Sequence, residues 1–221
     1  MQAMILAAGK GTRMQPLTNQ IPKALAQFKK LSLIEHLIIN LKKYNIQDII
    51  INLHYLGDQI KNKLGNGNNL GVNIQYSQEN TLLDTGGGIV QAINNQLLKS
   101  SPFIVISADI VTNFDFSCLF KKLSKLAHLI LVPNPSYKLN GDFSLDNNNL
   151  QLPLDNNKLN FTYANIGIFD PSFFLNPPQN IVPLNFFIKK AINNQQITAE
   201  VYSGLWKNIG TIKELHEATS I

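Results

Sequence analysis

The 221-residue chain contains a single cysteine and a single arginine, and it has no long apolar run. With Cys118 alone, no internal disulfide can form, and a reducing compartment is the simpler expectation. No segment approaches the roughly 20 apolar residues that a membrane-spanning helix needs. The N-terminal residues have no basic region and reach Gly9 quickly, which is typical of a buried strand and not of a signal peptide. We therefore expect a cytoplasmic protein without a membrane partner.

A basic stripe is also missing, although the formal net charge is +5 and the pI is about 9.2. The lysines occur as scattered pairs, and no aromatic-rich strand lies between them. This pattern is typical of solvated helices and loops. We therefore expect an anionic small-molecule substrate and no nucleic-acid partner.

Arg13 stands out because all other residues in the Lys+Arg total of 19 are lysines. Because lysine supplies all other positive side-chain charge, the single arginine is expected to do what lysine cannot, such as forming bidentate hydrogen bonds to phosphate. The 4 histidines show no metal-ligand spacing, and no serine lies in a Ser-His-Asp pattern. Zinc and serine-hydrolase chemistry are therefore not expected.

Short apolar runs alternate with amphipathic stretches through the first half of the chain. Residues 49–51 and 103–106 are apolar at every position, as expected for central parallel strands covered on both faces. This predicts an α/β fold with an open, mostly parallel, Rossmann-like sheet flanked by helices. The predicted strands are 3–8, 48–53, 72–77, 103–107, 163–169, 198–202 and 205–208, and the predicted helices are 31–44, 57–64, 87–98, 183–193 and 211–219.

The composition changes after Pro133, where Asn, Asp, Gly and Pro become frequent. We interpret residues 134–162 as a small β insertion that closes over a site like a lid. No internal repeat or long linker divides the chain, so residues 1–221 are predicted to form a single domain.

A glycine-rich turn follows the first predicted strand, at the sheet edge where open α/β folds bind ligands. The segment reads Leu6-Ala7-Ala8-Gly9-Lys10-Gly11-Thr12-Arg13. Its glycines allow close backbone approach, and exposed N–H groups in such a turn bind phosphate oxygens. Met14 excludes the dinucleotide fingerprint, and no glycine precedes Gly9 at the spacing of a P-loop. Taken alone, the segment is more typical of a tight turn with two solvated cations.

Two further residues fit a phosphate site. Pro22 stiffens the backbone that carries Lys23. Asp109 follows the buried strand predicted at 103–107, where a carboxylate suits a hard cation, although a turn aspartate is equally common there.

Together, these motifs resemble the sugar-1-phosphate nucleotidyltransferase family, over essentially the whole chain. In length and in its Thr-Gly-Gly-Gly segment, the sequence is most similar to bacterial N-acetylmuramate 1-phosphate uridylyltransferases. Mannose-1-phosphate guanylyltransferase-like proteins come next, and the hexapeptide repeats of larger relatives are missing. The matching motifs lie at residues 6–14, 22–23, 84–88, 107–109, 140–143, 165–167 and 206–211.

The resemblance implies a nucleotide-diphospho-sugar transferase fold and in-line attack of a sugar 1-phosphate on the α-phosphorus of an NTP, with Mg²⁺ as cofactor. It implies a place in nucleotide-sugar biosynthesis for the cell wall, such as peptidoglycan recycling. Catalysis would fall to Arg13, Lys23 and Asp109. Nucleotide binding would fall to Leu6, Ala8, Gly9, Lys10, Gly11, Thr12, Arg13, Thr85, Gly86, Gly87 and Asp109. The sugar phosphate would contact Lys23, Asn140, Gly141 and Asn165, and the metal would contact Asp109 and Asn208.

Position 208 departs from the family pattern, because relatives usually carry an aspartate there as a second metal ligand. One alternative is therefore a catalytically weak protein that binds nucleotide or sugar phosphate. Another is a nucleotide-sugar glycosyltransferase, although the Asp-x-Asp element of such enzymes is missing at residues 108–111. The base stays open between uracil and guanine, the sugar between N-acetylmuramate, a hexose and a heptose, and the assembly between monomer and homodimer.

Overall fold

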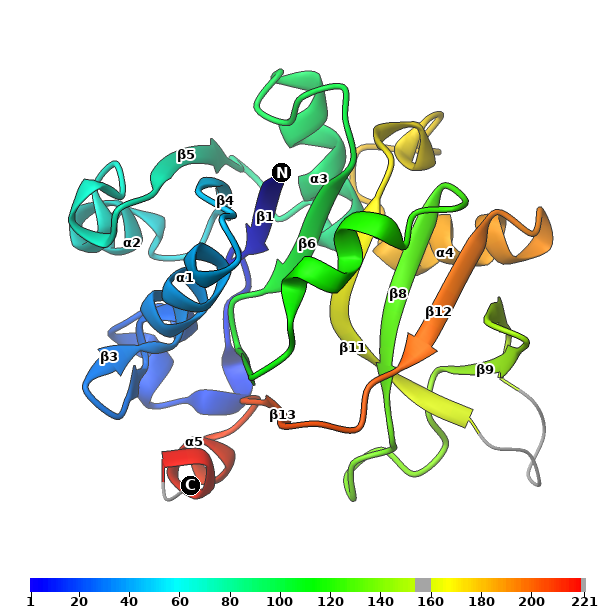
Figure 1. Cartoon of the computed structure of the whole chain (residues 1–221). Coiled ribbons are helices and arrows are strands. Elements are labelled where there is room, and N and C mark those ends of the chain that lie inside the picture. Colours follow the sequence, from blue (N-terminus) through cyan, green and yellow to red (C-terminus); the bar gives the residue numbers. More distant parts are fainter. Residues whose placement is uncertain (154–159, 220–221) are drawn as a thin grey trace.

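The computed structural model describes residues 1–153 and 160–219, and within them a nine-stranded sheet forms the centre of the molecule (Figure 1). The strand order is β5-β4-β1-β6-β11-β8-β12-β10-β9. Its first four strands run parallel to one another: β5 (Asn73–Gln78), β4 (Asp48–Leu53), β1 (Gln2–Leu6) and β6 (Phe103–Ser107). This half matches the predicted parallel strands.

The other half of the sheet is mixed in direction. Strand β11 (Asn160–Phe169) runs antiparallel to both β6 and β8 (Ala127–Val132), while β12 (Ile197–Val201) lies parallel to β8. The α/β class is confirmed, and the sheet is less parallel than predicted. Strand β8 was missing from the predicted set, although all six of its residues are buried.

Both faces of the sheet are covered by helices, as the doubly apolar strands predicted. Figure 1 shows α1 (Leu33–Lys43) in front of the sheet and α3 (Asp84–Asn94) and α4 (Leu184–Asn193) behind it. Neighbouring residues of β1 serve opposite layers: Met4 packs in the cluster with α3 and α4, and Ile5 in the cluster with α1. Helix α2 (Gly57–Leu64) and the 3₁₀ segment η5 (Phe116–Lys121) also cover the front face.

Local sequence sets two helix starts that differ from the prediction. Helix α1 begins at Leu33 because Ser32 and Glu35 form a capping box, in which the Ser32 N–H donates to Glu35 Oε2 over 2.9 Å. Helix α3 begins at Asp84, three residues before the predicted start, so Gly86 and Gly87 lie inside its first turn.

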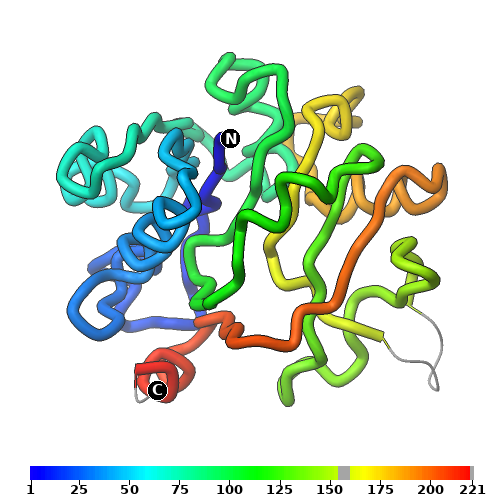
Figure 2. The backbone as a smooth tube through the Cα atoms, in the orientation of Figure 1, coloured from blue at the N-terminus to red at the C-terminus, as the bar shows by residue number. Residues whose placement is uncertain are grey.

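The C-terminal segment returns to the N-terminal loops (Figure 2). Strand β13 (Trp206–Asn208) pairs antiparallel with β7 (Ile110–Thr112), and α5 (Ile212–Thr219) follows. Met14, Ile209 and Leu215 belong to one buried apolar cluster, which joins the first loop to the last helix. The remaining short elements are β2 (Gln27–Phe28), β3 (Leu31–Ser32), η1 (Thr12–Met14), η2 (Leu17–Asn19), η3 (Lys23–Leu25), η4 (Asn68–Leu70) and η6 (Pro171–Phe174).

The predicted insertion at residues 134–162 contains a hairpin of β9 (Phe143–Asp146) and β10 (Asn149–Gln151), which extends the edge of the main sheet. Part of this insertion, residues 154–159, lies outside the described residues. Its action as a lid and the single-domain organisation stay predictions. No helix in the described part of the chain is long and apolar enough to span a membrane.

Candidate functional site

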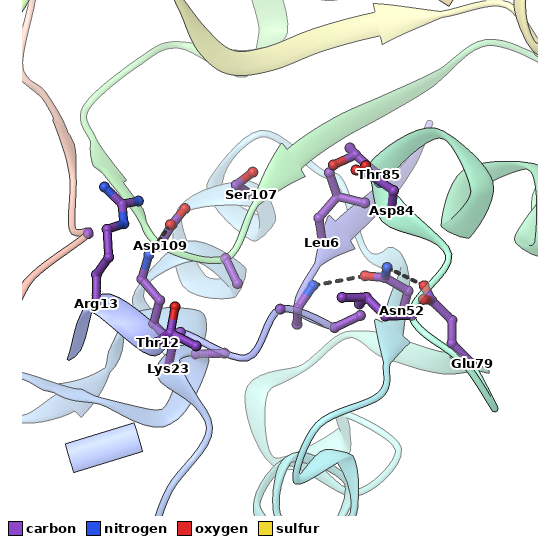
Figure 3. Close-up of a pocket in the computed structure, with 18 of the residues that line it drawn as sticks. Leu6, Thr12, Arg13, Lys23, Asn52, Glu79, Asp84, Thr85, Ser107 and Asp109 are labelled. Carbon is purple, nitrogen blue, oxygen red and sulfur yellow. Dashed lines mark hydrogen bonds and ion pairs between the residues drawn. The ribbon is translucent and has the colours of Figure 1, made fainter. Parts of the chain in front are cut away.

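A cavity of about 560 Å³ opens where the parallel strands end, at the sheet edge that the sequence indicated (Figure 3). The last residue of β1, Leu6, and the last residue of β6, Ser107, both line it. The loop after β1 forms one wall, and the residues that open α3 form the opposite wall. The lining includes Leu6, Ala7, Ala8, Gly9, Gly11, Thr12, Arg13, Lys23, Asn52, Glu79, Asp84, Thr85, Ser107, Asp109 and Gly210.

The glycine-rich loop is held in place by its neighbours. Ala108 N donates to Leu6 O over 3.0 Å, which extends the β1–β6 pairing past the strand ends. Gly11 has φ +63°, and a Cβ there would lie 3.0 Å from the Cβ of Lys23 and from Thr18 Cγ2. Only glycine fits this turn without strain. The next turn buries Met14 completely and leaves Arg13 exposed at the cavity.

Lys23 and Asp109 form an ion pair inside the cavity, between Lys23 Nζ and Asp109 Oδ2 (Figure 3). Their side chains are 15% and 20% exposed. Lys23 begins η3 directly after Pro22, whose fixed φ sets the direction of the segment. The pair therefore fixes an ammonium group next to the one carboxylate that follows β6.

The β7–β13 pair brings Asp109 and Asn208 into neighbouring positions, although they are 99 positions apart along the chain. The register of β7 and β13 pairs Asn208 with Ile110, and Ile209 N donates to Asp109 O over 2.9 Å. Oδ1 of Asp109 and Oδ1 of Asn208 are both buried without a hydrogen-bond partner among residues 1–153 and 160–219. Buried oxygens without partners are costly, and these two suit a hard cation.

Arg13 lies against the backbone of the C-terminal segment. A Cβ at Gly210 would lie 3.1 Å from both terminal nitrogens of the guanidinium, so the glycine makes room for it. Glu214 Oε2 accepts hydrogen bonds from Gly210 N over 2.7 Å and from Thr211 Oγ1 over 3.1 Å. Gly210, which follows β13, therefore lines the same cavity as the first loop.

A second cavity of about 930 Å³ adjoins the first. Arg13, Asp84 and Thr85 line both cavities. The second cavity continues between the predicted insertion and α4, and its lining includes Tyr137, Lys138, Gly141, Asp142, Tyr163, Asn165, Lys189, Trp206 and Asn208. Two ligands bound in these cavities would therefore meet between Arg13 and the Asp84–Thr85 start of α3.

The backbone conformation at position 165 explains why an asparagine lies within β11. The register with β8 shifts between Tyr163 and Ile166, and Asn165 has φ +56°, which asparagine tolerates better than most residues. The bulge turns Asn165 to the second cavity, and the carbonyl of Ala164 accepts from Trp206 Nε1 over 2.9 Å.

The structure brings most of the predicted site residues together. Leu6, Ala8, Gly9, Gly11, Thr12, Arg13, Lys23, Thr85 and Asp109 line the first cavity, and Gly141, Asn165 and Asn208 line the second. Lys10 and Asn140 are exposed and belong to neither lining.

Gly86 and Gly87 have a packing role that differs from the predicted one. A Cβ at Gly86 would lie 2.8 Å from Val182 O, and one at Gly87 would lie 2.3 Å from Asn180 O. Gly87 N donates to Val182 O over 2.9 Å. Close contact with the 180–182 backbone therefore gives these glycines a packing role, and their contact with a nucleotide stays a prediction.

Asn52 and Glu79 line the first cavity, and sequence reasoning missed both. They are 3% and 1% exposed, and Asn52 Nδ2 donates to Glu79 Oε1 over 2.7 Å (Figure 3). Burial raises the pKa of the Glu79 carboxyl, while the Leu83 N–H and the Asn52 amide oppose that rise. The available signal was Asn52 itself, a polar residue near the end of an apolar strand.

Comparisons with known proteins identify the family of this chain. A model of the nucleotidyl transferase family matches residues 2–140. The chain is 37% identical to the N-acetylmuramate alpha-1-phosphate uridylyltransferase of Neisseria meningitidis serogroup B, across all of this chain and 98% of that protein. The chain therefore belongs to the nucleotidyl transferase family.

More distant relatives share part of their length or the fold. The chain is 33% identical to a mannose-1-phosphate guanyltransferase of Gibberella zeae over 120 residues, which are 54% of this chain and 33% of that protein. Among solved structures, HddC from Yersinia pseudotuberculosis superposes with a TM-score of 0.84 at 22% identity, over 99% of this chain and 98% of that one. This likeness confirms the predicted fold class.

Proposed function

We propose that this protein transfers a uridylyl group from UTP to N-acetylmuramate 1-phosphate, giving UDP-N-acetylmuramate and pyrophosphate. The observation that carries the proposal is the 37% identity, over full length, to an enzyme of that name. The two adjoining cavities support it, because they offer separate space for a nucleotide and for a sugar phosphate.

The charges of the first cavity indicate how the nucleotide lies. Figure 3 shows Arg13 and Lys23 toward one end, and Asn52 and Glu79 toward the other. Cations attract the triphosphate, whereas the carboxylate of Glu79 repels it. The nucleoside therefore occupies the Asn52–Glu79 end, and the phosphates reach Arg13, where the second cavity begins.

The reaction needs positioning more than it needs a nucleophilic side chain. A phosphate oxygen of the sugar 1-phosphate attacks the α-phosphorus of UTP, and the bond from that phosphorus to the β-phosphate bridging oxygen breaks. Pyrophosphate leaves with the electron pair of that bond. Arg13 binds the phosphates through its forked guanidinium, and Lys23 neutralises charge beside the α-phosphate.

The residues present fit Mg²⁺. Asp109 Oδ1 and Asn208 Oδ1 are buried oxygens without hydrogen-bond partners in the described part of the chain, they belong to neighbouring positions of the β7–β13 pair, and Mg²⁺ prefers oxygen ligands. The described residues hold no group of three or more His, Cys, Asp and Glu side chains suited to a metal. Phosphate oxygens and water would complete the coordination, and the bound ion would neutralise charge on the phosphates.

Asn208 favours a second candidate function, a protein that binds the nucleotide but turns it over weakly. An amide oxygen coordinates Mg²⁺ without contributing negative charge, so the site has one carboxylate from this pair of residues. The distinction between the two functions lies in the rate of the chemical step and not in the fold.

Incubation with Mg²⁺, each NTP and a panel of sugar 1-phosphates, followed by pyrophosphate measurement, tests both functions. The proposed enzyme releases pyrophosphate with UTP and N-acetylmuramate 1-phosphate, and Asp109→Ala abolishes the release. Release with GTP and a hexose or heptose 1-phosphate instead would reassign the substrates. UTP binding without release for any pair would favour the weak-turnover function.

A further inference from the structure

A buried hydrogen-bond chain joins the two walls of the first cavity. Ala7 N donates to Asn52 Oδ1 over 2.8 Å, and Asn52 Nδ2 donates to Glu79 Oε1 over 2.7 Å. Leu83 N donates to Oε2 of the same carboxylate over 3.1 Å. Ala7 belongs to the wall that follows β1, and Leu83 directly precedes α3, which begins the opposite wall.

We propose that Glu79 is a positioning residue that sets the spacing of these two walls. Asn52 links the Glu79 carboxylate to the loop after β1 through its own hydrogen bond with Ala7. The spacing determines how well the nucleoside of the NTP fits. This inference rests on the proposed function, because it assigns the nucleoside to this end of the cavity.

The chemistry of the two side chains fixes their orientation. An ionised carboxylate only accepts hydrogen bonds, so it accepts from Leu83 N–H on one side and from the Asn52 amide on the other. Asn52 must then present Nδ2 to Glu79, which leaves Oδ1 facing the Ala7 N–H. The donor and acceptor order runs in one direction along the whole chain of contacts.

The surroundings of Gly88 independently support close packing of Asn52 against Glu79. A Cβ at this position would lie 2.5 Å from Glu79 Oε1 and 2.8 Å from Asn52 Nδ2. The third glycine of the Gly-Gly-Gly segment thus leaves room for the Asn52–Glu79 contact. An alanine at position 88 would displace one of the two side chains.

The Glu79→Gln substitution breaks this one-directional order of donors and acceptors. The glutamine amide nitrogen donates, so the new side chain satisfies only one of its two neighbours. Either Leu83 N–H faces a donor, or Asn52 turns and presents its own donor to Ala7 N–H. Each arrangement leaves a buried hydrogen bond unmade, which typically costs about 1–3 kcal/mol.

Exchanging the amide and the carboxylate between positions 52 and 79 restores the one-directional order of donors and acceptors. In the double variant Asn52→Asp/Glu79→Gln, the new carboxylate accepts from Ala7 N–H and from the glutamine amide. The glutamine oxygen then accepts from Leu83 N–H. Every contact is remade with the same net charge, whereas Asn52→Asp alone places two carboxylates against each other.

The test compares the two single variants with the double variant by UTP affinity in the presence of Mg²⁺, measured by titration calorimetry. We expect Glu79→Gln to weaken UTP binding about tenfold, equivalent to about 1.4 kcal/mol, and the double variant to recover most of that loss. Steady-state kinetics should show the change in the KM for UTP, with kcat within about twofold. Amide hydrogen exchange at Ala7 and Leu83 should quicken in Glu79→Gln and slow again in the double variant.

Asn73→Asp is the matched control. Asn73 Nδ2 donates to Asp48 Oδ1 over 3.2 Å, an amide–carboxylate contact at the opposite end of the β4–β5 pair from Asn52 and Glu79. This variant should leave UTP affinity unchanged.

Unchanged affinity in Glu79→Gln, or a double variant no better than the single variants, would overturn the positioning role. If Glu79→Gln fails to fold, a folded double variant with near-normal UTP affinity supports the role, and an unfolded double variant contradicts it. UTP binding is measured without a sugar, so a protein that binds UTP but releases no pyrophosphate contradicts the proposed reaction alone.

Discussion

Asp109 and Asn208 are held next to each other by the β7–β13 pair, and each directs a buried oxygen without a hydrogen-bond partner among the described residues. Lys23 binds the other oxygen of Asp109. Asp109 lines the first cavity and Asn208 the second, so the charge of these two side chains should affect both metal binding and turnover.

Asn208→Asp should strengthen Mg²⁺ binding, because it adds a second carboxylate beside Asp109. We expect the Mg²⁺ concentration for half-maximal activity to fall about tenfold, equivalent to about 1.4 kcal/mol, because the added negative charge attracts the divalent cation. Mg²⁺-dependent thermal stabilisation in the presence of UTP provides a readout independent of activity. Asn95→Asp adds the same charge at an exposed position after α3 and should change neither quantity. Equal Mg²⁺ dependence in Asn208→Asp and the unmodified protein would argue against Asn208 as a ligand.

Arg13→Lys should lower kcat/KM about 100-fold while the melting temperature stays the same. Lysine retains the charge but not the forked pair of donors, and Arg13 is exposed, so folding does not depend on it. Lys10→Ala should have a smaller effect, since Lys10 lines neither cavity. Kinetics of both variants at saturating Mg²⁺ measure this difference. A larger loss in Lys10→Ala than in Arg13→Lys would reverse the assignment.

Two glycine-to-alanine changes should separate ligand approach from packing. Gly9 has no heavy atom within 4 Å of an added Cβ, yet it lines the first cavity, so Gly9→Ala should fold normally and bind UTP more weakly. Gly87→Ala would place its Cβ 2.3 Å from Asn180 O and should cost about 1–3 kcal/mol of stability. Thermal melting and UTP titration of the two variants check this. A stable Gly87→Ala protein would contradict the packing role of that glycine.

The stability of the fold should fall below neutral pH because of His128. Burial lowers the pKa of His128 below its ordinary value of 6.5, although Glu200 opposes that shift. The unfolded chain therefore takes up a proton at higher pH than the folded chain. The free energy of unfolding should decrease as pH falls from above 6.5 through the folded-state pKa.

His128→Gln should flatten this part of the pH dependence, measured by urea unfolding between pH 7.5 and 5. An unaltered slope in His128→Gln would assign the effect to other groups.

The sequence predicted structure best where residues close together in the chain determine it. Neighbouring residues in the sequence were enough to predict the loop around Gly9 and Arg13. The same holds for Lys23, which follows a proline, and for Asp109, which follows a buried strand. Helix α2 was predicted with its observed bounds.

Features that depend on distant partners were harder to predict. Strand β11 runs antiparallel beside β6, which its apolar residues alone do not reveal, because such residues suit either direction. Asn52 and Glu79 meet across 27 positions, and the reason for Gly88 is that contact. The packing of Gly87 likewise depends on residue 180, far along the chain.

The most direct test of the account is the product formed from UTP, N-acetylmuramate 1-phosphate and Mg²⁺, identified by mass spectrometry alongside the pyrophosphate released. We expect UDP-N-acetylmuramate and pyrophosphate in equal amounts, with both lost in Asp109→Ala. Absence of both products, in a folded protein that also fails to use any other NTP and sugar 1-phosphate, would contradict the proposed reaction.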